Sequence, residues 1–165
     1  MINLLEFFPK TAILPLQDQP YHELMEQLVN YCLADCDNTV KQQALLEIRS
    51  KSKTRSPQDI NLGRGFALIH AKTNQVKEIH TAVGILVRPK KLLKGERIQN
   101  ILCIILPESQ SRTYLSLLAR LGRMLRHKDA AGAFSRAGKL FSSGNSEEAK
   151  DTVIELFRQF EQGQS

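Results

Sequence analysis

The stretch that decides the fold is residues 63–70, which read Gly63-Arg64-Gly65-Phe66-Ala67-Leu68-Ile69-His70. Two glycines lead into a short apolar segment, which predicts a turn followed by a β-strand that ends on His70. A histidine ring is partly neutral near pH 7, so it can act as a nucleophile or accept a phosphoryl group. A histidine at a strand end is more often a surface or packing residue, so the surrounding pattern has to decide between these interpretations.

Length and composition limit the class of protein. The chain has 165 residues, 42% of them hydrophobic and 24% charged. These values predict one globular domain spanning residues 1–165. No apolar run approaches the ~20 residues of a membrane span, and the N-terminus does not resemble a signal peptide. We therefore expect a cytoplasmic protein that does not insert into the membrane.

Three cysteines are present, Cys32, Cys36 and Cys103. They lie in apolar surroundings and are odd in number. Buried, reduced thiols are the favoured interpretation, and a metal site built from the three is the alternative. The cysteines therefore do not predict a metal ion.

Charge is distributed unevenly along the chain. Residues 1–40 hold one basic and six acidic residues, a net charge of −5, and residues 141–165 have a net charge of −3. The middle hundred residues therefore carry +14, within a total of +6. Such a bias suits nucleic acid, an anionic membrane or an acidic protein partner. The basic residues are scattered and few aromatic residues stand among them, which favours a solvated surface and makes nucleic acid an unfavoured partner.

Apolar periodicity predicts helices at both ends of the chain and strands between them. The predicted strands are Phe66–His70, Thr81–Val87 and Ile101–Leu106, the last apolar on both faces like a central strand. The predicted helices are Tyr21–Leu33, Thr39–Lys51 with Asn38 as a candidate cap, one that starts near Ser109, a weaker one over 129–142, and a last one after Asn145-Ser146-Glu147-Glu148.

This order of elements predicts an α/β fold, in which helices flank a mixed sheet in three α/β/α layers. In such folds ligands gather at strand ends and in the loops that follow them. His70 ends the first predicted strand, and the segment from Glu108 to Tyr114 follows the third. These two places are expected to form the rim of one site.

The segments also resemble a known family. Gly63, Gly65, Ala67 and His70 match a Gly-x-Gly-Ile-Ala-Ile-Pro-His pattern, and Thr113-Tyr114-Leu115 follows a strand and a proline as a Thr-His-Leu segment does. Both patterns are similar to the type 2 IIA domains of the bacterial phosphotransferase system, the fructose, mannitol and nitrogen-regulatory branch. The resemblance covers nearly the whole chain and implies the fold of phosphotransferase and anion transport proteins.

The resemblance implies a phosphoryl relay in sugar transport or its regulation. His70 would accept the group from the phosphocarrier HPr and pass it to a IIB domain, which would make the chain a phosphohistidine phosphotransferase component. Backbone N–H groups near Gly63, Gly65 and Ser109 would form the phosphate loop. Arg49 would contact the phosphate, with Arg55 or Arg64 as substitutes, and Tyr114 stands where the family has a second histidine. The relay implied by the resemblance needs no metal ion and no diffusible cofactor.

Some residues differ from the family pattern. Ile69 replaces the proline before the histidine, and Ala71 replaces the following glycine. Tyr114 can donate a hydrogen bond but cannot become a cationic imidazole. An alternative therefore stays open, in which the chain is an unphosphorylated IIA-like regulatory module that binds a transporter, a kinase or a transcription regulator.

Overall fold

A computed structural model describes residues 2–54, 61–93 and 96–163 and contains a five-stranded mixed sheet. The order of strands across the sheet is β1-β4-β5-β3-β2. Strand β5 runs parallel to β3 and antiparallel to β4, and the outer pairs are β1 parallel to β4 and β2 antiparallel to β3. The strands are β1 Ile13–Leu16, β2 Asn61–Gly63, β3 Phe66–Lys72, β4 His80–Leu93 and β5 Glu96–Leu106.

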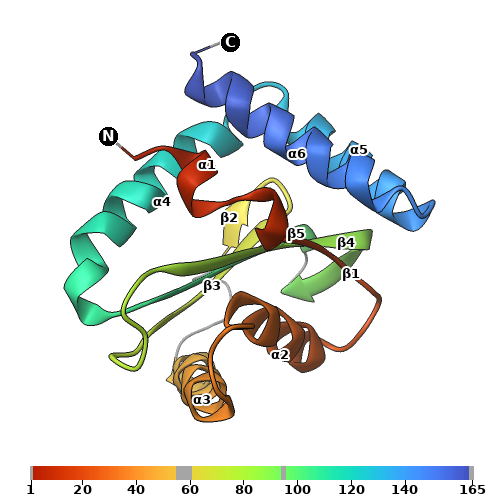
Figure 1. The fold of residues 1–165 in the computed structure, drawn as a ribbon. Helices are drawn as coiled ribbons and strands as arrows, with labels where there is room; N and C mark the ends of the chain where they lie inside the picture. Colours follow the sequence, from red (N-terminus) through yellow and green to blue (C-terminus); the bar gives the residue numbers. More distant parts are fainter. Residues whose placement is uncertain (1, 55–60, 94–95, 164–165) are drawn as a thin grey trace.

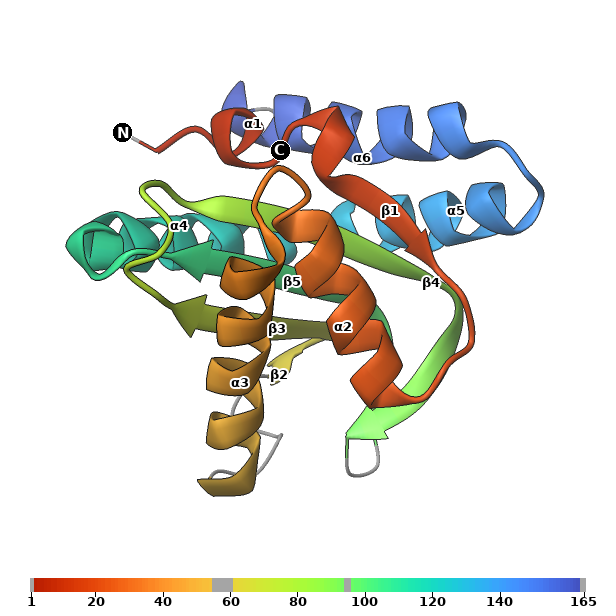
Figure 2. The same ribbon diagram turned by 60° about the horizontal axis from the view of Figure 1, so that its bottom comes forward.

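Helices cover both faces of the sheet, which confirms the predicted three-layer α/β fold (Figure 1). One face packs against α2 and α3, and the other packs against α1, α4, α5 and α6. Figure 2 shows α2 and α3 in front of the sheet and α5 and α6 behind it. The helices are α1 Leu4–Phe7, α2 Tyr21–Cys32, α3 Asn38–Thr54, α4 Ser111–Leu125, α5 Ala130–Ser142 and α6 Ser146–Glu161.

The central position predicted for Ile101–Leu106 is confirmed. These residues form the second half of β5, the middle strand of the sheet, and all of them are buried. Successive side chains of a strand point to opposite faces, so a strand covered on both sides is apolar throughout. The other two predicted strands are also present, although β3 and β4 extend beyond the predicted bounds to Lys72 and Leu93.

Two edge strands were not predicted from the sequence. Strand β1 contains Pro15, which cannot donate a ladder hydrogen bond and is tolerated because β1 pairs only with β4. Strand β2 is only three residues long and pairs with β3 through an irregular register. Neither segment is long enough to show a clear alternation of apolar and polar residues.

The predicted helix starts need two corrections. Helix α3 is capped by Asp37, whose carboxylate accepts the Val40 N–H at 3.1 Å, so Asn38 is already helical. Ser109 does not open an α-helix; it lies in the 3-10 turn Glu108–Gln110, and α4 begins two residues later. The last two helices form where the sequence predicts them, over 130–142 and from Ser146.

The cysteines are free thiols in the structure. Cys32 and Cys103 are buried in the core beneath α2 and α3, as predicted, whereas Cys36 is only half-buried. Among the described residues, no helix is long and apolar enough to cross a bilayer.

Candidate functional site

His70 lies near the carboxyl end of β3, at one edge of the sheet. It is in register with Ile104 of the parallel strand β5, and Ile104 is in register with Thr81 of β4. The alternation of side chains puts His70 on the same face as Phe66 and Leu68, which pack beneath α4, α5 and α6. The residue is half-buried and its Nδ1 atom is buried. Nδ1 is therefore closed to an outside partner.

Tyr114 lies directly against His70. It sits in the first turn of α4, and the two rings are stacked with centroids 5.6 Å apart and an angle of 30° between their planes. Only 6% of Tyr114 is exposed, and burial raises the pKa of its phenol to about 12. The phenol therefore stays neutral near pH 7 and can offer a hydrogen bond without a positive charge.

The loop between β5 and α4 lies at the same edge as His70. The Thr73 N–H donates to the Leu106 carbonyl at 2.9 Å, and the Glu108 N–H donates to the Asn74 side chain at 3.3 Å. Ser109 is exposed in this loop, followed by the N-terminus of α4, which no side chain caps. The partial positive charge of a helix N-terminus favours an anion at this edge.

Lys72 adds a positive charge that was not predicted from the sequence. It follows His70 by two residues in β3, so both side chains leave the same face of the strand, with Cα atoms about 7 Å apart. Its ammonium lies 3.9 Å from the Glu108 carboxylate, and both side chains are partly exposed. The period of two in strands is the signal that could have identified Lys72, once His70 was selected.

The structure places Gly63 and Gly65 at the other end of β3. Both glycines have positive φ, at 81° and 84°, as does Arg64 between them at 54°. They form the turn between β2 and β3, where the Gly65 carbonyl accepts N–H groups from residues 99 and 100 of β5. His70 lies five positions after Gly65 along an extended strand, about 16 Å away, so the structure does not bring these glycines to the histidine ring. Their conformation explains the choice of glycine at both positions.

The predicted arginines are also apart from His70. Arg49 lies on α3, in the helix layer on the other face of the sheet, and its guanidinium is 3.7 Å from the Glu26 carboxylate. Arg64 lies in the β2–β3 turn, where its guanidinium donates to the Leu125 carbonyl at 3.5 Å. Arg55 falls outside the described residues.

The sequence of this chain is similar to one known protein family. The family model for the phosphoenolpyruvate-dependent sugar phosphotransferase system EIIA 2 matches residues 8–140. The chain belongs to the EIIA type 2 family. This match includes His70 and Tyr114 and ends within α5, and it confirms the family predicted from residues 63–70 and 113–115. No curated protein sequence matches the chain significantly.

Solved structures share the fold of this EIIA domain at low sequence identity. The nitrogen regulatory protein IIA-Ntr of Neisseria meningitidis has a TM-score of 0.70 at 18% identity, covering 91% of this chain and 98% of its own. IIA mannitol of Escherichia coli has a TM-score of 0.62 at 13% identity, with 90% and 96% covered. A PTS IIA protein of Streptococcus mutans, PtxA, described as putative, has a TM-score of 0.67 at 13% identity, with 94% and 90% covered.

Two residues that differ from the family pattern beside His70 face the opposite core. Ile69 and Ala71 are 1% and 0% exposed and pack with the residues beneath α2 and α3. Because they point away from the His70 ring, they change the packing of β3 rather than the chemistry at the edge of the sheet. Tyr114, in contrast, differs from the family pattern and contacts the His70 ring of this EIIA domain directly.

Proposed function

We propose that this EIIA domain accepts a phosphoryl group on Nε2 of His70 from a phosphohistidine carrier of the HPr type. The observation that carries the proposal is the half-buried His70 ring, stacked on Tyr114 at the edge of the sheet where α4 begins. Membership of the EIIA type 2 family supplies the reaction class.

Burial of the Nδ1 atom supports a transfer through Nε2. With its proton on Nδ1, the imidazole keeps a lone pair on Nε2, which attacks the phosphorus of the carrier phosphohistidine. A new N–P bond forms on His70 while the N–P bond of the carrier breaks, and the electron pair of that bond stays on the carrier's nitrogen. The proton on Nδ1 remains in place, and the carrier ring leaves as a neutral imidazole when its other nitrogen carries a proton.

Positive charge at the edge of the sheet would stabilise the phosphoryl oxygens. Lys72 leaves the same face of β3 as His70, the N-terminus of α4 adds a partial charge, and the Tyr114 hydroxyl is a neutral donor. Lys72 thus takes the role that the resemblance gives to Arg49. From His70 the group would pass to a IIB domain, or stay as a regulatory mark.

The test is the intact mass after incubation with phosphoenolpyruvate, the first enzyme of the system and HPr. The expected result is the gain of one acid-labile phosphoryl group, absent in His70→Ala and slower in Lys72→Gln. Lys77→Gln is the matched control, because Lys77 is an exposed lysine beyond the end of β3. A chain that gains no mass from its own organism's carrier would contradict phosphorylation.

A second function is favoured by Tyr114 alone. Its phenol is neutral near pH 7 and cannot supply the positive charge that a protonated histidine would supply at this position. In this alternative the chain is a regulatory module that binds its partner protein without phosphorylation. Equal partner binding by the wild type and His70→Ala, together with no mass gain, would support it.

A further inference from the structure

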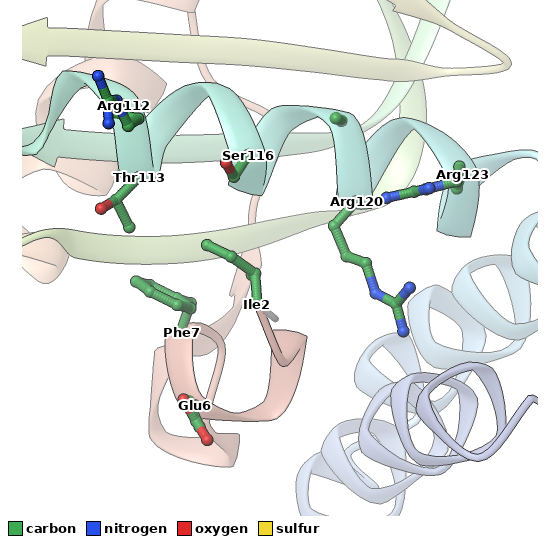
Figure 3. Close-up of a pocket in the computed structure, with 9 residues that line it drawn as sticks. Ile2, Glu6, Phe7, Arg112, Thr113, Ser116, Arg120 and Arg123 are labelled. Carbon is green, nitrogen blue, oxygen red and sulfur yellow. The ribbon is translucent and has the colours of Figure 1, made fainter.

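We propose that a groove between α1 and α4 binds an acidic, extended segment of a partner protein. The groove has a volume of about 650 Å3 and lies beside the outer face of α4 (Figure 3). It is lined by Ile2, Glu6, Phe7, Arg112, Thr113, Ser116, Ala119, Arg120 and Arg123. We call it the α4 groove. His70 and Tyr114 do not line it, so it is separate from the site at the edge of the sheet.

The basic residues of the groove form one stripe along α4. One face of the helix carries four residues spaced four, three and four positions apart, namely Arg112, Ser116, Ala119 and Arg123. The two arginines stand at the ends of this row. The opposite face, including Tyr114, is buried against the sheet. Residues 111–125 include no aspartate or glutamate, so α4 itself does not neutralise the stripe.

The three arginines are not equivalent. Arg120 is bound to Glu161 by two hydrogen bonds of 3.2 and 2.7 Å, and its guanidinium stacks on Phe160 at 4.6 Å. In contrast, no carboxylate among the described residues lies within ion-pair distance of Arg112 or Arg123, and both residues are exposed. These two side chains therefore supply the positive charge that a ligand can reach.

The spacing of Arg112 and Arg123 selects the shape of the ligand. They are separated by eleven residues of α-helix, which is about 16 Å along the axis. One carboxylate contacts both arginines only if both side chains reach toward each other along the helix, so two separate acidic groups fit this spacing better. An extended peptide rises about 3.3 Å per residue and turns every second side chain to the same face. Two acidic side chains four residues apart therefore face the groove together about 13 Å from each other, and the long arginine side chains can close the remaining distance. Between the two arginines the groove offers the apolar side chains of Ile2, Phe7 and Ala119.

Charge complementarity favours an acidic peptide over a nucleic acid. Phe7 is the only aromatic residue that lines the groove, and stacking of bases needs several such rings. Two accessible arginines are also few for a phosphate backbone. Glu6 lies on the α1 side of the groove and would repel acidic ligands, so removal of its charge should strengthen binding.

The test uses a pentapeptide with glutamate at both ends and three apolar residues between them, attached to an uncharged dye. Its binding to the full chain is measured by fluorescence anisotropy at about 20 mM salt, where exposed charges are weakly screened. The variant is the double substitution Arg112→Gln and Arg123→Gln. The control is the double substitution Lys139→Gln and Arg136→Gln, which removes two exposed charges from α5, outside the groove.

The expected result is a Kd at least roughly tenfold higher for the α4 variant, and within about twofold of wild type for the α5 variant. Glu6→Gln should lower the Kd. The proposal is overturned if the peptide does not bind, if a peptide with glutamine at both ends binds equally, or if the α5 variant weakens binding as much. It is also overturned if a peptide whose two glutamates are adjacent binds as tightly. A further contradicting outcome is that a short single-stranded oligonucleotide displaces the labelled peptide at a lower concentration than the unlabelled peptide does.

This inference does not rest on the phosphorylation of His70. His70→Ala leaves every residue of the α4 groove in place, so it is expected to bind the peptide with the wild-type Kd. If the chain binds the peptide but gains no phosphoryl group, the proposal about the α4 groove is supported and the proposal about phosphoryl transfer is contradicted. Circular dichroism of each variant checks that the helices are intact.

Discussion

The imidazole ring of His70 is stacked on the phenol ring of Tyr114, with centroids 5.6 Å apart. The two residues are 44 positions apart in the chain and meet because α4 begins one short turn after β5, the strand parallel to β3. The contact holds the imidazole ring in one orientation, and the low exposure of Tyr114 excludes water from that side of the histidine. Predictions about activity and pH follow from this pair.

Replacement of Tyr114 by histidine is expected to speed phosphorylation of His70 by up to roughly tenfold, because a charged donor stabilises phosphoryl oxygens better than a neutral one. The gain should be greatest near pH 6 and fade above the ordinary histidine pKa of about 6.5. Quenched time courses by mass spectrometry measure the rate. Tyr114→Phe is the control, since it keeps the stacked ring without a donor. A Tyr114→His rate equal to that of Tyr114→Phe at all pH values would contradict the prediction.

Alkaline pH is expected to destabilise the fold through Tyr114. Its pKa is about 12 in the folded chain and about 10 when unfolded, so ionisation favours the unfolded state as the pH rises from 10 to 12. The loss is about 1 kcal/mol at pH 11. Urea unfolding at pH 8 and pH 11 measures it. Tyr114→Phe should lose less stability than wild type between the two, while Tyr21, whose pKa is also about 12, contributes equally to both proteins.

The ion pair between Arg120 and Glu161 is expected to stabilise the packing of α1, α4 and α6. Glu161 accepts two hydrogen bonds from Arg120 and one from the Leu4 N–H, and its side chain is 11% exposed. Glu161→Gln should lower the free energy of unfolding by roughly 2 kcal/mol. Glu155→Gln is the control, because its pair with Arg158 is half-exposed and is worth at most about 0.5 kcal/mol. Equal losses in urea unfolding would contradict the difference in burial.

The Glu161 carboxylate also makes the free energy of unfolding depend on pH in the acid range. Burial acts to raise the pKa of Glu161, but the hydrogen bonds from Arg120 and Leu4 outweigh burial and leave this pKa below its ordinary value. A lowered pKa contributes stability that is present above pH ~4.5 and lost as the pH falls. Glu161→Gln should therefore differ least from wild type at the lowest pH where both proteins fold.

Alanine substitutions at two glycines are expected to change the free energy of unfolding in opposite directions. A Cβ atom at Gly84 in β4 would lie 2.4 Å from a Leu16 side-chain carbon and 2.8 Å from one of Leu28, both fully buried. Gly84→Ala should therefore cost about 1–3 kcal/mol. At Gly132 in α5 a Cβ meets only the end of Arg136 at 3.6 Å, so Gly132→Ala should add about 0.5–1 kcal/mol. Thermal unfolding of the two variants tests both signs.

The main layers of the fold were predictable because their sequence signals are local. The six apolar residues of 101–106 indicate a strand buried on both faces, and the helical spacing of apolar residues in α2, α4 and α6 indicates one buried face each. The edge strands β1 and β2 were missed, because one contains Pro15 and the other has only three residues. Their pairing depends on neighbours that are remote in sequence.

The site was predictable in part for the same reason. The position of His70 at a strand end and of Tyr114 at the start of a helix follow from local patterns, and the order of strands then brings the two together. Arg49 and the glycines were expected near His70 because the family resemblance implied it. The two ends of β3, however, lie about 20 Å apart, which separates the glycines from His70. Arg49 is separated from His70 because the two residues lie on opposite faces of the sheet.

The sequence by itself indicated the family, the order of the longer helices and of the three longer strands, and the histidine near the end of β3, because these depend on local apolar periods and on short segments such as residues 63–70. Only the tertiary structure decided the partners of that histidine. The parallel pairing of β3 with β5 brings Tyr114 and the start of α4 to its ring, whereas the sheet keeps Arg49 on the opposite face. The α4 groove likewise exists only because residues 2–7 pack against α4, a contact between segments more than a hundred residues apart.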